Sequence, residues 1–363
     1  MKAAVLQTLA SPFVVEDLDY LPPEPDRVLV RTHATPFCST DCTNWAGKFG
    51  KVPPVILGHA SIGEVVEVGR DVRHVAVGQR VVVPGTPECG RCYYCSIGRP
   101  DQCSELFDRT DGYPIVAISG AGQKVRASGN VGGYAELMSV SANQVFAVES
   151  DLGSDVLSLM GCGIMTGVGS VFNVARVQPG ESVAVIGCGH LGQWVVQAAR
   201  LAGAAQIFAI DPVAERTAMA LKLGATHAID PATEDAIELV RDATDGRGSD
   251  HAIEAAGPAG SQELAVAVTR RAGTVVLNGV KQLGTTVTYS QVSIAVQGRA
   301  ILSSQNGNVR MRRDLARYVS LLEEGLLDPE PIITSRYRLD GINDALRASA
   351  ELRDLSGLIV FDH

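Results

Sequence analysis

The sequence lacks any long apolar run and any segment rich in lysine and arginine. No stretch approaches the roughly 18 consecutive apolar residues typical of a membrane-spanning helix. Residues 1–9 carry one charge and too short an apolar stretch for a signal peptide. The 31 basic residues are outnumbered by 40 acidic ones, and the resulting formal net charge of −9 repels polyanions. We therefore expect a cytoplasmic protein that binds neither a membrane nor a nucleic acid.

Internal repeats and low-complexity segments are also absent, and charged residues make up only 20% of the chain against 46% hydrophobic residues. Such a composition supports well-filled cores and argues against disorder. The 363 residues exceed the length of one ordinary domain, so we expect two. Because cytosolic thiols stay reduced, the eight cysteines are more readily explained by metal binding or catalysis than by disulfides.

The apolar pattern changes along the chain. Up to about residue 148, short valine-rich runs broken by glycine and proline predict a β-rich, barrel-like domain, at residues 28–31, 63–68, 80–84 and 136–140. From about residue 166, apolar strands alternate with longer helical stretches, which predicts parallel βαβ units, at residues 182–186, 191–202, 207–210, 215–223, 251–254, 262–268 and 274–277. Two further helices, at 312–324 and 341–353, and a strand at 358–361 complete the chain.

A glycine fingerprint follows the apolar stretch 182–186. Gly187, Gly189 and Gly192 form a GxGxxG motif between a predicted strand and a predicted helix. The first glycine permits the tight turn, the second lets the backbone approach a pyrophosphate, and the third allows close packing of helix on strand. The next strand ends at Asp211, placed to accept hydrogen bonds from a ribose and to repel a 2′-phosphate. This motif predicts a dinucleotide site that prefers NAD over NADP, with an ordinary glycine turn and a helix-capping aspartate as the alternative.

Four cysteines lie within fifteen residues, at Cys89, Cys92, Cys95 and Cys103. Four thiolates can close a tetrahedral zinc site and leave no position for substrate, so we expect structural zinc. An iron–sulfur cluster is the rival. By residue type, Cys38, His59 and Cys162 could form the three-ligand set of a catalytic zinc. Composition alone does not connect residues so far apart, and a lone histidine is more often structural; Cys188 lies inside the fingerprint and needs only to be small.

The chain resembles the zinc-containing medium-chain alcohol dehydrogenases over almost its whole length. The motifs that carry the resemblance, in the family's order, are Cys38-Ser39-Thr40-Asp41, Gly58-His59, the cysteine lobe 89–103, Gly161-Cys162-Gly163 with Thr166-Gly167, and the fingerprint 187–192. The resemblance implies an α/β fold with a split GroES-like β-rich catalytic domain at 1–163 and 306–363. It also implies a structural zinc lobe at 86–106 and a Rossmann cofactor domain with a doubly wound parallel sheet at 164–305.

The resemblance also assigns roles to individual residues. Cys38, His59 and Cys162 would bind a catalytic zinc, and Cys89, Cys92, Cys95 and Cys103 a structural zinc, giving two zinc ions per chain. Thr40 would contact the alcohol hydroxyl and accept its proton, and Asp41 would orient the His59 imidazole. The proton would then leave by way of Thr43, water or another group. The NAD-binding residues would be Ser39, Thr166, Gly187, Gly189, His190, Leu191, Gly192, Asp211, Arg216 and Gly279.

Several positions depart from the family pattern. Ala60 replaces the glutamate that usually follows the ligand histidine, while Ser39 and Thr43 replace a basic residue and the histidine that ends the proton relay. Gly85 and Val131 stand where ethanol-oxidising relatives have bulky aromatics, so we expect a substrate pocket wide enough for alcohols larger than ethanol. The 59-residue interval from Cys103 to Cys162 resembles the dimeric branch and predicts a homodimer.

These observations predict an NAD-linked, zinc-dependent alcohol dehydrogenase that interconverts an alcohol and its carbonyl compound. A thiol-dependent formaldehyde dehydrogenase of the same family is the first alternative, because those relatives share both zinc sites and the long loop. The zinc-free quinone reductases of the superfamily lack the ligand cysteines. A catalytically silent, dehydrogenase-like binding protein is the alternative from another class, and Ala60 is its only support.

Overall fold

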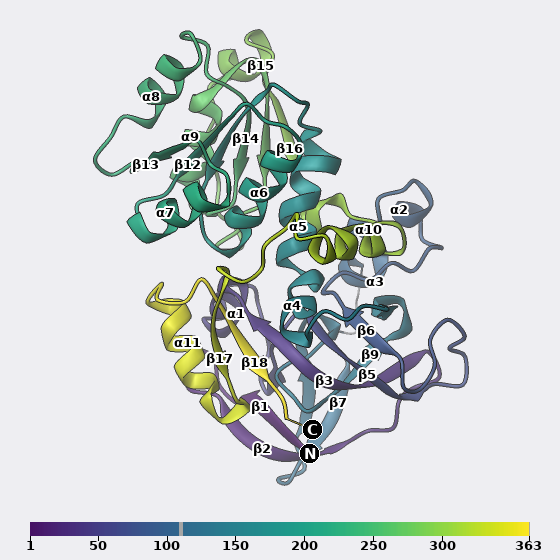
Figure 1. Cartoon of the computed structure of the whole chain (residues 1–363). Coiled ribbons are helices and arrows are strands. Elements are labelled where there is room, and N and C mark those ends of the chain that lie inside the picture. The colour runs from purple at the N-terminus through teal and green to yellow at the C-terminus, as the bar shows by residue number, and fades with distance from the viewer. Residues whose placement is uncertain (109–111, 363) are drawn as a thin grey trace. The chain divides into compact units, whose positions relative to one another are not determined.

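Two units, interleaved along the sequence, make up the chain in a computed structural model that describes residues 1–108 and 112–362 (Figure 1). Unit 1 comprises Met1–Cys162, Arg310–Glu323 and Ile332–His363. Unit 2 comprises Gly163–Val309 and Glu324–Pro331. The chain thus leaves unit 1 twice. It leaves after Cys162 and returns at Arg310, then leaves again after Glu323 for a short second segment of unit 2 before its C-terminal part completes unit 1.

Unit 1 is built on a small barrel and a larger sheet. The closed barrel consists of β1 (Lys2–Leu6), β2 (Val14–Tyr20), β7 (Ile115–Ser119), β8 (Lys124–Ala127) and β4 (Val55–Ile56). The seven-stranded sheet has the order β10 (Phe146–Ala147), β6 (Arg80–Val83), β5 (Ser61–Val68), β3 (Arg27–Phe37), β18 (Ser356–Val360) and β17 (Ile333–Tyr337), with β9 (Leu137–Ser141) also paired to β3. Val360 to Ala34 and Gly357 to Phe37 mark the antiparallel register through which the C-terminal strand extends the N-terminal sheet.

Valines fill the interior beside this sheet. Val28, Val30, Val65 and Val81 are buried in one apolar cluster, as expected where β-branched side chains from neighbouring strands pack on one face. The helices of unit 1 are mostly short: α1 (Ser39–Trp45), α2 (Tyr93–Ser96), α3 (Ser104–Phe107), α4 (Ser154–Ser158), α10 (Met311–Glu323) and α11 (Ile342–Ala350).

Unit 2 contains a six-stranded, all-parallel sheet. Its order is β13 (His227–Ile229), β12 (Gln206–Ile210), β11 (Ser182–Ile186), β14 (Ser249–Glu254), β15 (Thr269–Leu277) and β16 (Ala300–Ser303). Every residue of β11 is buried, which is typical of a central parallel strand covered on both faces. The chain order and the strand order change direction at β11, so the crevice beyond its carboxyl end is where such sheets bind ligands.

Helices connect the strands of this sheet, as Figure 1 shows. They are α6 (His190–Leu201), α7 (Ala214–Leu223), α8 (Ala236–Ala243) and α9 (Ala259–Val268), while α5 (Gly163–Gly169) precedes the first strand, β11. The Asp235 carboxylate caps α8 by accepting from the N–H groups of Ile237 and Glu238. Gly224 follows the last residue of α7, and few other residues adopt its φ of 121°.

The predicted α/β class, with a β-rich unit and a parallel-sheet unit, is confirmed. The apolar patterns missed short elements, including α8, β13 and β16. Among the described residues no single helix is long and apolar enough to cross a membrane, although one bent pair, Ser154–Gly161 with Gly163–Ala175, passes by length and composition. The apolar residues of that pair, such as Leu157, Met160 and Ile164, are fully buried in the protein.

Candidate metal centres and cofactor site

Cys38, His59 and Cys162 come together in unit 1, although they are far apart in the sequence. Cys38 lies between β3 and α1, His59 lies between β4 and β5, and Cys162 follows the turn Leu159–Gly161. Their two sulfurs and one imidazole nitrogen all lie within 4.8 Å of one another. The Nε2 atom of His59 is 3.4 Å from the Sγ atom of Cys162. Two thiolates and an imidazole are a common zinc donor set that leaves a fourth position for an oxygen ligand.

Asp41 fixes the orientation of the His59 ring. Its carboxylate is fully buried and lies 3.1 Å from Nδ1 of His59, so Nε2 is left to face the cysteine sulfurs. The same carboxylate accepts from the backbone N–H groups of Cys38 (3.2 Å) and Gly58 (3.3 Å). A carboxylate behind a ligand histidine selects the tautomer that can bind metal through the other nitrogen. Asp41 thus connects the segment that carries Cys38 with the segment that carries His59.

Helix α1 carries the three hydroxyl residues singled out in the sequence. Thr40 is half-buried in its first turn, while Ser39 is exposed. The buried Thr43 hydroxyl donates to the Ser39 carbonyl at 3.0 Å, which uses its proton inside the helix. Within the described part of the chain, the Thr43 hydroxyl thus has a local hydrogen bond to Ser39 and none to Thr40. Its part in proton exit stays a prediction.

Ala60 packs where the family pattern has glutamate. Its side chain is fully buried, and a Cβ atom at Gly161 would lie 2.9 Å from the Cβ of Ala60. Ala60, directly after His59, and Gly161, directly before Cys162, therefore pack closely against each other.

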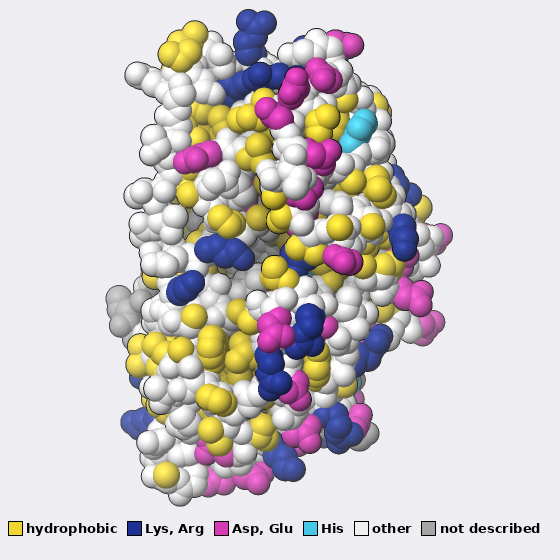
Figure 2. Space-filling view, turned by 90° about the vertical axis from the view of Figure 1, so that its left-hand side faces the viewer, with side chains coloured by type: hydrophobic (Ala, Val, Ile, Leu, Met, Phe, Trp, Pro, Cys, Tyr) yellow, Lys and Arg dark blue, Asp and Glu magenta, His cyan; other side chains and the backbone are white. Residues whose placement is uncertain are grey.

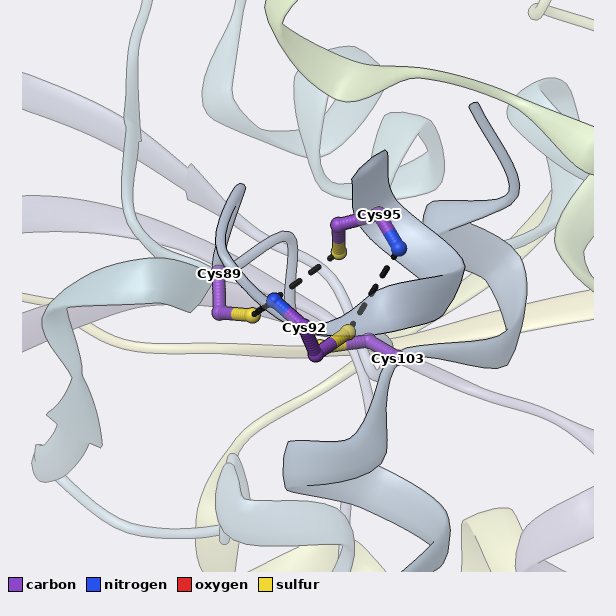
Figure 3. Close-up of side chains that lie close together, drawn as sticks. All are labelled: Cys89, Cys92, Cys95 and Cys103. Atoms are coloured by element: carbon purple, nitrogen blue, oxygen red, sulfur yellow. Dashed lines mark hydrogen bonds between the residues drawn. The ribbon is translucent and has the colours of Figure 1, made fainter. Parts of the chain in front are cut away.

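Cys89, Cys92, Cys95 and Cys103 form the second cluster, and Figure 3 shows their side chains pointing toward one another. Their four sulfurs lie within 4.8 Å of each other. The N–H groups of Cys92 and Cys95 donate to the sulfurs of Cys89 and Cys92, each at 3.4 Å. Backbone donors aimed at sulfur favour the thiolate form that binds metal. The four-fold, all-sulfur arrangement fits a structural zinc ion.

The glycine fingerprint of unit 2 has the backbone geometry that the motif predicts. Gly187 follows β11 with a φ of 92°, and a Cβ there would lie 2.7 Å from the side chain of Ala256. A Cβ at Gly192 would come within 2.0 Å of the Gly187 carbonyl, so only glycine permits this contact between turn and helix. At Gly189, which caps the twelve-residue helix α6, the nearest atom to an added Cβ is Nη1 of Arg216 at 3.8 Å. The helix start is thus open to an anion and has a guanidinium beside it.

Asp211 and Cys188 connect this turn to the next strand. The buried Asp211 carboxylate accepts from the N–H groups of Cys188 (2.8 Å) and Val213 (2.9 Å). Cys188 is fully buried, and burial raises the pKa of its thiol, in agreement with its expected role as a small residue. Each carboxylate oxygen of Asp211 keeps a second lone pair, so these bonds leave it able to accept from a ribose.

The other expected cofactor residues lie in unit 2, except Ser39. His190 and Leu191 open α6, where the His190 ring packs edge-on against Trp194. The Thr166 hydroxyl is 3.4 Å from the Asn306 side-chain oxygen, and Gly279 follows β15. Sequence reasoning missed Glu254, a fully buried carboxylate at the end of β14. Its oxygens accept from Ala256, Gly257, Gly279 and the Ser261 hydroxyl, which ties together the turns beyond two neighbouring strands.

Gly85 and Val131 both have structural explanations of their own. A Cβ at Gly85 would lie 2.8 Å from the carbonyl oxygen of His59, so the position has little room for any side chain. Val131 is fully buried in the valine cluster of unit 1. Their assignment to a substrate pocket stays a prediction, and the small size of Gly85 follows from backbone packing beside His59.

Comparisons with known proteins agree with this geometry. A model of the alcohol dehydrogenase GroES-like domain matches residues 24–150, and one of the zinc-binding dehydrogenases matches residues 191–324. The chain is 32% identical to geraniol dehydrogenase of Castellaniella defragrans over 99% of this chain and 97% of that one. It is 33% identical to S-(hydroxymethyl)glutathione dehydrogenase of Escherichia coli over 99% of both. The crystal structure of benzyl alcohol dehydrogenase from Acinetobacter calcoaceticus superposes with a TM-score of 0.92, at 29% identity over 99% of both chains.

A GroES-like unit, a Rossmann unit and a cysteine-histidine metal centre together define a zinc-binding dehydrogenase. The chain belongs to the zinc-containing medium-chain alcohol dehydrogenase family.

Proposed function

We propose that this protein is an NAD-linked alcohol dehydrogenase that moves a hydride between the carbinol carbon of an alcohol and nicotinamide. The observation that carries the proposal is the convergence of Cys38, His59 and Cys162, with Nε2 of His59 directed at the Cys162 sulfur and Nδ1 held by Asp41. Three donors of this kind suit a catalytic zinc, whereas the separate four-cysteine cluster suits a structural zinc.

In this proposal zinc supplies Lewis acidity that lowers the pKa of the alcohol hydroxyl, and NAD supplies the hydride acceptor. The chain's own residues do the rest. Thr40 orients the alcohol hydroxyl and accepts its proton, which then leaves by way of Thr43 or water. Asp41 keeps the His59 ring in the tautomer that binds metal through Nε2.

The proposed cofactor site is formed by Gly187, Gly189 and Gly192, whose open turn at the start of α6 suits a pyrophosphate. Asp211 would accept from the adenosine ribose and disfavour a 2′-phosphate, and Arg216 would add a positive charge beside the turn. Leu191, Thr166, His190, Gly279 and Ser39 complete the proposed contacts with NAD. These features support NAD rather than NADP.

We propose a primary or secondary alcohol bulkier than ethanol as the substrate. Two relatives are named for geraniol and benzyl alcohol, and both of these are larger than ethanol. The second candidate activity, oxidation of a formaldehyde–thiol adduct, is favoured by the 33% identity to S-(hydroxymethyl)glutathione dehydrogenase. A cytoplasmic location is part of the proposal because clustered thiols remain metal ligands in reducing surroundings.

A homodimer is proposed for the assembly. Strand β16 is the edge of the parallel sheet and exposes Leu302, with Val292 and Val296 exposed on the preceding turn. An edge strand leaves backbone groups unpaired, and pairing of two copies of β16 about a two-fold axis would satisfy them. Sedimentation at several protein concentrations tests this, and a monomer at all of them would contradict it.

The activity is tested by following NAD reduction with primary, secondary, allylic, aromatic and alicyclic alcohols, and with formaldehyde in the presence or absence of glutathione or mycothiol. The proposal expects turnover on bulky alcohols, far slower turnover on ethanol, and no dependence on thiol. Thiol-dependent oxidation of formaldehyde as the dominant activity would select the second candidate. Intact zinc and NAD binding without turnover on any of these compounds would favour a silent binding protein.

A further inference from the structure

Four arginines from separate segments line one hollow in unit 2, at the amino-terminal ends of the parallel strands. The hollow has a volume of about 360 Å³ and is lined by Arg241, Gly246, Arg247, Arg271, Gln297 and Arg299. Arg241 lies in the last turn of α8, and the others lie close to the starts of β14, β15 and β16. The glycine fingerprint follows the carboxyl end of β11. The hollow and the proposed NAD site therefore lie at opposite ends of the parallel strands.

The positive charges of the hollow are poorly balanced. Arg299 donates to uncharged acceptors, the Thr269 carbonyl (2.8 Å), the Ser293 hydroxyl (2.7 Å) and the Gln297 side chain. Arg247 pairs at 3.2 Å with Asp245, but both side chains are largely exposed, so this pair contributes little. Within residues 1–108 and 112–362, the guanidinium groups of Arg241 and Arg271 have no hydrogen bond or ion pair.

Arg241 and Arg299 lie close enough to repel each other. Burial lowers the pKa of Arg299, and the positive charge of Arg241 lowers it further. Figure 2 shows Lys and Arg side chains gathered at the top of the view, the end of unit 2 where α8 and β15 lie in Figure 1, with acidic side chains to one side. In a chain with a formal net charge of −9, a hollow lined by four guanidinium groups is a marked local exception.

We propose that this hollow binds a small phosphorylated anion at a site separate from the active centre. Planar guanidinium forks match the paired oxygens of phosphate and hold them by charge-assisted hydrogen bonds. The volume lies in the range of about 300–1,000 Å³ typical of small-molecule sites, so it admits a phosphate ester as well as the free ion. The acidic net charge and the confinement of these guanidinium groups to one hollow disfavour a nucleic-acid backbone, which needs an extended basic surface.

Isothermal titration of the zinc-loaded enzyme with inorganic phosphate, against sodium chloride at equal ionic strength, tests the site. Arg241→Gln and Arg271→Gln remove guanidinium groups that make no hydrogen bond to any described residue, so these variants should fold normally. Each should weaken phosphate binding by about tenfold, the effect of losing one charge-assisted contact. Arg299 is left unchanged because its hydrogen bonds hold Thr269 and Ser293 in place.

Arg353→Gln is the matched control, because Arg353 is an exposed arginine of unit 1 that pairs with Glu351. Its phosphate affinity should equal that of the wild type. Ribose 5-phosphate should bind at least as tightly as inorganic phosphate, since the hollow has room for the ester. Phosphate affinity that is unchanged in both hollow variants would assign the binding to the glycine turn and overturn the proposal, as would equal heats with chloride.

Discussion

Replacing Asp41 by asparagine tests how the candidate catalytic centre is held together. The carboxylate faces three donors: the N–H groups of Cys38 and Gly58 and the Nδ1–H of His59. Asparagine has nearly the same shape, but its amide nitrogen cannot accept, so at least one donor loses its partner. Loss of a hydrogen bond to a buried charged group costs about 1.5–3 kcal/mol. If this cost falls on the zinc-bound state, zinc affinity at the three-residue centre falls by roughly ten- to a hundredfold.

The assay is competition for zinc with a chelator, followed together with NAD-linked alcohol oxidation. Asp41→Asn should release one zinc ion more readily than wild type and keep the other, and turnover should decline in step with the zinc lost. Asp314→Asn is a matched control, because Asp314 is equally buried in unit 1 but pairs with Arg313 and the Arg310 backbone. The control should lose stability without weakening this zinc ion. Unchanged zinc affinity and turnover in Asp41→Asn would refute the role given to Asp41.

Three further substitutions probe the remaining parts of the account. Cys92→Ser should reduce the zinc content by one ion and lower the unfolding temperature, whereas Cys162→Ser should abolish turnover with little change in the unfolding temperature. A similar fall in unfolding temperature in both variants would contradict two separate centres. Asp211→Gly should raise kcat/KM with NADP relative to kcat/KM with NAD. Both values should fall in absolute terms, because the hydrogen bonds to Cys188 and Val213 are lost. A wild type that uses both cofactors equally would show that Asp211 does not select NAD. Glu254→Gln should lower the free energy of unfolding by about 1.5–3 kcal/mol and raise the KM for NAD. The reason is that one of the four donors to Glu254 must then face an amide nitrogen. An unchanged denaturant midpoint would contradict this.

Elements with a strong apolar period were predictable from the sequence. Strand β11 and helix α6 follow directly from the apolar run 182–186 and the amphipathic stretch 191–202. Helix α8 was missed because its apolar positions, Ile237, Leu239 and Val240, are few and follow a polar loop. The edge strand β16 was missed for a related reason, since an exposed edge lacks the continuous apolar run of a central strand.

The metal centres differ in how far sequence alone could predict them. The four cysteines at 89–103 are close in sequence, so their spacing alone indicates a closed site. Cys38, His59 and Cys162 come from three distant segments, and only the family resemblance connected them before the fold was known. Contacts that depend on backbone packing had no sequence signal, such as Gly85 against His59 and Gly161 against Ala60. Glu254 had a signal that was overlooked, because like Asp211 it is an acid at the end of a buried parallel strand.

The most direct test of the central claim is the rate of NAD reduction with geraniol and benzyl alcohol, measured as a function of zinc bound per chain. Protein with two zinc ions should turn over, and activity should fall to background in Cys38→Ser protein, which retains the four-cysteine centre and one zinc ion. The account is contradicted if Cys38→Ser protein with one zinc ion reduces NAD at the wild-type rate, or if the wild type with two zinc ions oxidises neither alcohol.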